Sequence, residues 1–243
     1  MSKIEVDQID PQSGTTLTLG TSGDTVVVPS GVSLAPGGGL TLTGNFVVDG
    51  GTVKLDGNYP TGTSNVALGD AALDDGSLSG GYNVAVGNAA LGENEGGQEN
   101  VAIGFNSLDA NTSGSNNTGL GSQSLGGNTT ASDNTAIGKN SLRATTTGNR
   151  NTALGSCALN ANTTGVNNVS SGFQSMLLNT TGSKNVAYGY NALGSNTEGN
   201  CNTAIGCGSL GQNTTASNNT AVGFDSLKAN TTGASNTAVG HCA

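Results

Sequence analysis

The chain is poor in the large side chains that usually fill a protein core. Among its 243 residues there is no tryptophan, only 3% are aromatic and only 9% are charged, whereas 41 are glycine. Burial of apolar surface is the main driving force of folding, so a single copy of such a chain has little to bury. The composition excludes an ordinary globular core and favours a repeat architecture that is completed by oligomerisation.

Positive charge and long apolar runs are also scarce. The net charge is −9, and residues 1–109 carry 13 acidic side chains but only 2 basic ones. No basic patch is interleaved with aromatic residues, which argues against nucleic-acid binding. No apolar run is long enough to span a bilayer, and the opening MSKIEVDQID lacks the apolar segment of a secretory signal. We therefore expect a soluble protein made in a cytoplasm, with no membrane insertion.

Few residues are of the types that carry chemistry. The four cysteines lie in the second half of the chain without metal-ligand spacing, and the single histidine, His241, adjoins the last of them. We expect free thiols, as in proteins assembled in a reducing compartment, with a stacked pair as the alternative. The cysteines are Cys157, Cys201, Cys207 and Cys242.

What the chain does have is an internal repeat. The pattern N-[TV]-A-[IVL]-G recurs eleven times with a few departures, at a spacing of 18 residues once and 17 residues nine times. If the asparagine is rung position 1, glycine fills position 5 in every copy, and leucine or methionine fills position 9 after an alanine or serine. The repeat asparagines are Asn65, Asn83, Asn100, Asn117, Asn134, Asn151, Asn168, Asn185, Asn202, Asn219 and Asn236.

The complete rung is NTAIGxxSLxxNTTGxx, in which position 4 supplies a second apolar side chain in most copies. Positions 1 to 5 alternate as in a short strand, the glycine permits a bend, positions 7 to 11 predict a second strand, and NTTG turns back. The strict period indicates stacking, and the one extra residue falls in DDGSLSGG, residues 74–81. Asparagine and threonine columns are expected to form ladders along the stack.

These features predict an all-β fold in two parts. Residues 61–243 are expected to form a parallel β-solenoid, or β-roll, with eleven repeat starts and an incomplete last rung, about 50 Å long at ~4.8 Å per rung. Residues 1–60 read as short β runs between turns and are predicted to be an N-terminal anchoring or capping segment. The chain stops at Ala243 without a capping sequence, so we expect further chain or a partner to cover that edge.

The rung NTAIGxxSLxxNTTGxx, over residues 65–243, resembles the repeats of phage tail-fibre-like proteins, which commonly end in a self-cleaving chaperone that drives trimerisation. Motifs such as NVAVG and NTAIG also resemble, less closely, the head repeats of trimeric autotransporter adhesins. Those families form left-handed parallel β-rolls as intertwined trimers, with shorter rungs. The resemblance therefore implies a left-handed, homotrimeric solenoid. The first 20 residues look like the start of structural proteins in marine tailed phages.

No catalytic, cofactor-binding or metal-binding residue is assigned, and no cofactor is expected. His241 lacks the neighbours of a Ser-His-Asp site. Carboxylate pairs of the kind that some phage fibres use to cut polysaccharide would have to come from a group that we expect to be solvated turn residues. That group is Asp74, Asp75, Glu93, Glu95 and Glu99.

Position 6 is the most variable column of the repeat. It holds an aromatic residue in four rungs and lysine, serine or cysteine in others, so we expect it near the surface. The aromatic rings are suited to stacking on the sugars of a host glycan or to filling a crevice between protomers, and neither role is assigned here. The four are Phe105, Phe173, Tyr190 and Phe224.

Together these observations predict a non-enzymatic, homotrimeric structural protein of a virion, assembled in the host cytoplasm, most simply a bacteriophage tail fibre. Its expected partners are its own copies, another virion protein at the N-terminal end, and a host surface glycan or protein. The alternatives are a head fibre or other virion appendage, a polysaccharide depolymerase fibre, and an ice- or surface-binding solenoid. The last of these would use the position-13 threonines Thr112, Thr129, Thr146, Thr163 and Thr180, but the same position is occupied by Glu95 in another rung.

Overall fold

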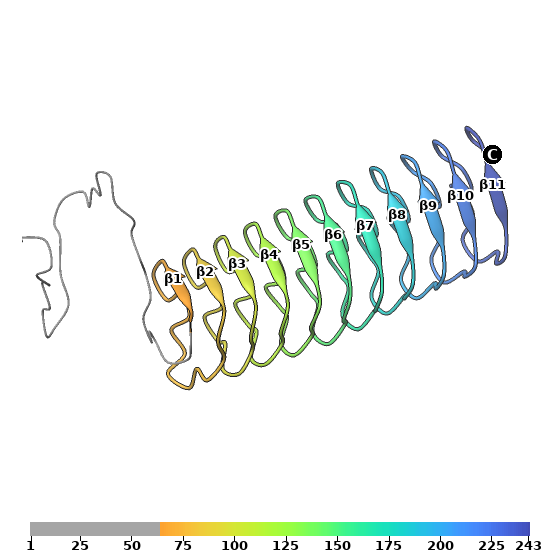
Figure 1. Ribbon diagram of the computed structural model, residues 1–243. Coiled ribbons are helices and arrows are strands. Elements are labelled where there is room, and N and C mark those ends of the chain that lie inside the picture. The colour runs from red at the N-terminus through yellow and green to blue at the C-terminus, as the bar shows by residue number, and fades with distance from the viewer. Residues whose placement is uncertain (1–63) are drawn as a thin grey trace, which may run out of the picture. The chain divides into compact units, whose positions relative to one another are not determined.

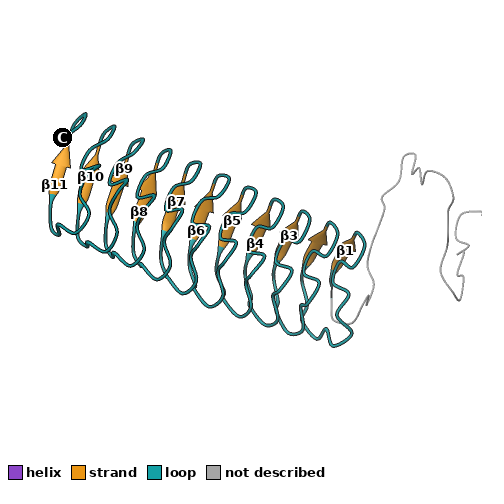
Figure 2. Cartoon of the chain, turned by 180° about the vertical axis from the view of Figure 1, so that it is seen from behind, coloured by secondary structure: helices purple, strands orange, loops and turns teal. Residues whose placement is uncertain are grey.

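The computed structural model describes residues 64–243, which form one parallel β-solenoid without helices (Figure 1). Each rung contributes one three-residue strand, and the eleven strands lie side by side in chain order in a single sheet (Figure 2). The segment predicted over residues 1–60 lies outside the described residues. The strands are β1 (Val66–Leu68), β2 (Val84–Val86), β3 (Val101–Ile103), β4 (Thr118–Leu120), β5 (Thr135–Ile137), β6 (Thr152–Leu154), β7 (Val169–Ser171), β8 (Val186–Tyr188), β9 (Thr203–Ile205), β10 (Thr220–Val222) and β11 (Thr237–Val239).

The register follows the sequence period. Ala85 pairs with Ala102 and Ala102 with Gly119, so each step moves along the chain by one 17-residue rung. In the first rung the Leu73 N–H donates to the Ala90 carbonyl, and the Ser79 N–H donates to the Glu95 carbonyl. These two hydrogen bonds place the extra residue of the first rung between Leu73 and Ser79. The 17-residue parallel solenoid and the position of its one insertion are therefore confirmed.

The core is narrow and is built from columns rather than from clusters. The middle residue of each strand, usually alanine, points inward, whereas the flanking residues at positions 2 and 4 are nowhere buried. Position 9 supplies the largest apolar side chain of the interior, one per rung, and all but the last are fully buried. This column comprises Leu73, Leu91, Leu108, Leu125, Leu142, Leu159, Met176, Leu193 and Leu210, followed by the half-buried Leu227.

The second strand predicted over positions 7 to 11 is wrong. Residues at positions 7 and 9 have left-handed backbone, with φ of 52° at Asn106 and 51° at Leu108. This compact turn buries both Ser107 and Leu108, whereas side chains at adjacent positions of a strand point to opposite faces. The turns are still bonded from rung to rung, because the Leu108 N–H donates to the Ser124 carbonyl over 3.0 Å.

Position 5 requires glycine because the stack leaves no room for a side chain there. At Gly155 φ is +131°, and a Cβ atom would lie 2.7 Å from the carbonyl oxygen of Gly172 in the next rung. The other position-5 glycines in rungs that are followed by another rung meet the same obstacle. Glycine at this position is thus a condition for stacking rather than a local flexibility.

Two asparagine columns, at positions 1 and 12, hold the rungs together from inside. The Asn117 N–H donates to the Asn100 Oδ1 over 2.9 Å, and the Asn111 Nδ2 donates to the Asn94 Oδ1 over 2.7 Å. Within one rung, the Nδ2 atoms of Asn100 and Asn111 both donate to the Gly114 carbonyl, over 2.9 and 3.0 Å. The predicted asparagine ladders are confirmed, and in the rungs that carry both asparagines they converge on one buried carbonyl, except in the rung of Asn219, whose Nδ2 has no partner.

The position-12 ladder is broken once, at Thr145. Threonine is too short to bridge to the neighbouring rungs, so the Asn128 Oδ1 and the Thr145 Oγ1 are buried without a hydrogen-bond partner. An unsatisfied buried polar atom costs about 1–3 kcal/mol. The break is therefore a local weak point in the middle of the stack.

The substitution Thr145→Asn should stabilise the protein by about 1–2 kcal/mol, because it completes the ladder between Asn128 and Asn162. Denaturant unfolding followed by circular dichroism measures the change. The matched control is Thr147→Asn, which makes the same change at an exposed position of the same rung and should have little effect. A loss of stability in Thr145→Asn would contradict the ladder as the source of the weakness.

Candidate functional surfaces

We define the outer sheet face as the side chains at rung positions 2 and 4. These are the first and last residues of every strand, from Val66 in β1 to Val239 in β11. All 22 of these side chains are uncharged, and none is buried. Nine of them are large apolar side chains with at least 37% exposure. They are Leu68, Ile103, Leu120, Leu154, Val169, Val186, Tyr188, Ile205 and Val239.

Position 6 follows the glycine bend at the end of each strand, and none of its side chains is buried, as predicted. Its four aromatic residues are exposed by 48–55%. Where two rings occur in successive rungs they stack, with centroids 6.0 Å apart for Phe173 and Tyr190 and 5.1 Å apart for Phe224 and His241. Its aromatic rings add exposed apolar surface two residues beyond the end of a strand, whereas other members of the column, such as Asp70 and Lys139, are charged.

The threonines at position 13 form a ladder of their own. The Thr112 Oγ1 donates to the Thr129 carbonyl over 3.1 Å, and the Thr129 Oγ1 donates to the Thr146 carbonyl over 3.1 Å. The same bond recurs from rung to rung as far as Thr231. These hydroxyl hydrogens are thus committed to the backbone instead of pointing into solvent.

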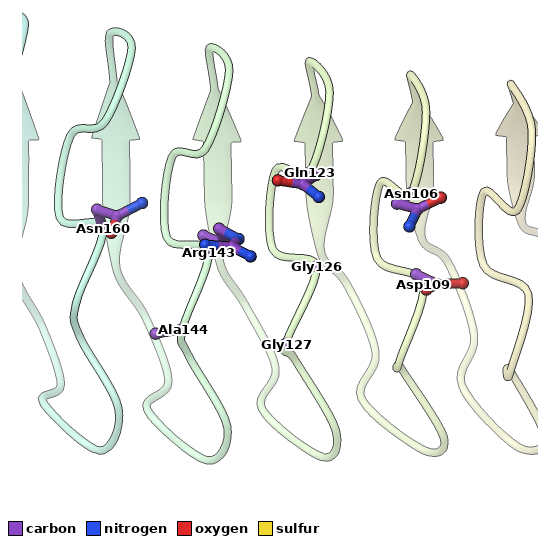
Figure 3. A pocket seen from close by; sticks show the side chains of 8 residues that line it. All are labelled: Asn106, Asp109, Gln123, Gly126, Gly127, Arg143, Ala144 and Asn160. Atoms are coloured by element: carbon purple, nitrogen blue, oxygen red, sulfur yellow. The ribbon is translucent and has the colours of Figure 1, made fainter.

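A pocket of about 410 Å³ opens on the turn side of the stack, where Gly126 and Gly127 replace side chains (Figure 3). Asp109 in the rung before and Arg143 in the rung after flank this glycine notch. The remaining lining comes from Ala144 and from three side-chain amides, those of Asn106, Gln123 and Asn160. The notch therefore offers a carboxylate, a guanidinium and several amides to a small polar ligand.

Sequence reasoning missed this notch, although a signal was present. Comparing position 10 across successive rungs places Asp109, Gly126 and Arg143 in one line, with opposite charges on either side of a missing side chain. The notch becomes visible only when residues 17 apart are considered together.

The carboxylates named from the sequence do not form a shared site. Asp74, Glu93, Glu95 and Glu99 are exposed and lie at different positions of their rungs. Asp75 is half-buried, and its Oδ1 accepts the Ser77 N–H over 2.6 Å within a turn. Their prediction as turn residues agrees with this placement.

One carboxylate that the sequence did not single out has a shifted pKa. Partial burial raises the pKa of Asp109, and the negative charge of Glu93 in the preceding rung raises it further. Asp109 is also the acidic residue that lines the glycine notch. The notch therefore contains a carboxylate that binds a proton more readily than an exposed aspartate does.

The four cysteines are free thiols, as expected. Cys157 and Cys207 are half-buried, whereas Cys201 and Cys242 are exposed. Within residues 64–243, no three side chains of histidine, cysteine, aspartate or glutamate are grouped closely enough to hold a metal ion. The same residues contain no helix with the length and apolarity needed to cross a membrane.

Comparisons with known proteins found no counterpart: no family model, no curated protein and no solved structure matches this chain.

The shifted pKa of Asp109 predicts a pH-dependent gain in stability for Asp109→Asn. An acid whose folded-state pKa is raised costs stability above that pKa and costs nothing below its unfolded pKa of about 3.9. The variant should therefore have a larger free energy of unfolding than the natural protein at pH 7, and the same value near pH 3. Denaturant titrations at the two pH values measure the difference.

Glu93→Gln should give a smaller gain in the same direction at pH 7, because Glu93 is the lesser cause of the shift. An equal gain for Asp109→Asn at both pH values would rule out the ionised carboxylate as the origin of the effect.

Proposed function

We propose that this chain is a structural virion fibre protein, a bacteriophage tail fibre, which assembles as a homotrimer and contributes to host attachment. The observation that carries the proposal is the continuous in-register stack of eleven strands. Each added rung extends the stack by ~4.8 Å, so the length of the solenoid increases in proportion to the number of repeats. This is the property that a projecting spacer needs. The NTAIG-type rung that resembles tail-fibre-like repeats points the same way.

The anchoring role of residues 1–60 and their docking on another virion protein belong to this proposal. The acidic excess of residues 1–109 suits a basic docking surface on a larger particle. A head fibre or another virion appendage would need the same spacer, and labelling of intact particles distinguishes these locations.

An ice-binding solenoid and a depolymerase fibre have less support. An ice-binding face needs threonine hydroxyls that are free to order water, but those at position 13 donate to the backbone of the next rung. A depolymerase needs paired carboxylates in a cleft, and only Asp109 adjoins the notch. We therefore favour the fibre.

Host contact in this proposal uses the glycine notch. Its amides, carboxylate and guanidinium match the hydroxyl groups of a sugar, each of which both donates and accepts hydrogen bonds. A volume of about 410 Å³ lies within the range of small-ligand pockets, roughly 300–1,000 Å³. The notch is therefore our candidate contact for a host surface glycan.

The location on a particle can be tested directly. Antibodies raised against the purified full chain, detected with gold, should label fibres on the tails of phages whose genomes encode it, as seen by electron microscopy. Label on the capsid would move the protein to a head fibre. Purified particles without any label would refute the virion assignment.

Glycan contact predicts a specific mutational result. Arg143→Ser should weaken binding of the full chain to host-surface polysaccharide roughly tenfold or more, because a charged hydrogen bond is lost. Arg150→Ser removes another arginine that does not line the notch, so it should bind normally. Glycan arrays and titration of isolated polysaccharide measure both variants. Equal loss in the two variants would indicate nonspecific charge attraction.

A further inference from the structure

We propose that the outer sheet face is the surface through which copies of this chain associate, in parallel and in register. This inference rests on the proposed homotrimeric fibre and assigns its interface to the side chains at positions 2 and 4, together with the adjoining aromatic residues at position 6. The occupant of the face is a second copy of the same chain. Three observations lead to this assignment.

The first observation is the amount of apolar surface on one side of the rung. Thirteen of the fifteen exposed large apolar side chains lie at positions 2, 4 and 6. A half-exposed large side chain presents on the order of 80 Å² of surface to solvent, so these thirteen side chains together expose roughly 1,000 Å². The largest patch on a typical monomer is about 300–600 Å², and a stable interface takes about 800 Å² from each partner. The face is thus large enough for a stable interface.

The second observation is the absence of charge. No side chain at positions 2 and 4 is charged in any of the eleven strands, although the chain as a whole carries a net charge of −9. Charged side chains lie at other positions of the rung, which include position 6 with Asp70 and Lys139 and position 17 with Asp133 and Arg150. Copies can therefore meet across this face without removing an ionised group at positions 2 or 4 from water.

The third observation is the period, which identifies the partner. Every strand carries at least one apolar side chain at positions 2 and 4, from Leu68 in β1 to Val239 in β11. A partner that packs against all eleven strands must present its own side chains at the same spacing and follow the same twist. A parallel copy of this chain meets that condition by construction, and the β1 strands of all copies then lie at the same end of the assembly.

The test compares two double variants by light scattering of the full chain. Leu120→Ser with Leu154→Ser removes two apolar side chains from the outer sheet face, and serine already occurs there at Ser171. Tyr82→Ser with Leu178→Ser removes the two exposed large apolar side chains that lie at other positions of the rung. We expect the natural chain and the second variant to have the mass of three chains. The first variant should dissociate to single chains that keep the circular dichroism spectrum of the solenoid.

Failure of this inference is distinguishable from failure of the proposed function. If both variants remain trimeric, the trimer stands and the outer sheet face is overturned as its interface. If the natural chain is a single chain in solution, both the interface and the trimer are overturned. The virion assignment is then still judged by gold labelling alone.

Cross-linking gives a second readout that does not depend on dissociation. With the four natural cysteines replaced by serine, Leu154→Cys should form disulfide-linked pairs on oxidation, because equivalent residues of parallel copies lie at one height. Leu178→Cys has nearly the same exposure, 48% against 49%, and should not cross-link. Cross-linking of Leu178→Cys but not of Leu154→Cys would overturn the proposal.

Discussion

Everything in this solenoid depends on an unbroken register between rungs. The backbone hydrogen bonds of strands and turns alike run mostly from one rung to the next, as do the asparagine ladders. If one rung slipped by one residue against the next, these hydrogen-bond donors and acceptors would lose their partners together. Each buried polar group without a partner costs about 1–3 kcal/mol. The register therefore explains both the constant 17-residue period and the glycine at position 5, where the next rung leaves no space for a Cβ atom.

The same constraint decides what the core contains. A rung so narrow admits one leucine or methionine, small residues and two buried amides, so the interior buries little apolar area per residue. Amides take the place of a larger apolar core because each is satisfied along the stack. The larger apolar side chains that remain, such as Leu154 and Tyr188, are then left outside. Association through that outer surface would add the burial that a single chain lacks.

Much of this architecture was predictable from the sequence, because period and composition are properties of every rung. The parallel solenoid, the ladders and the insertion between Leu73 and Ser79 all follow from spacing. The prediction of a second strand was wrong because it applied the two-residue period of a strand to positions 7 to 11. The side chains of adjacent residues such as Ser107 and Leu108 are both buried, which the left-handed turn allows and a strand does not. The glycine notch was missed because its residues are neighbours only across rungs.

Departures from the repeat are therefore where individual function can reside. A perfectly uniform stack presents the same surface at every height, so it can set reach and association but cannot position one ligand. Gly126 and Gly127 interrupt the turn side once between opposite charges, and that interruption creates the notch. Thr145 interrupts the ladder in the rung that follows it and weakens the stack locally. The consensus residues build the stack, and exceptions such as Gly126 and Gly127 create the local features on which a ligand-specific contact could be built.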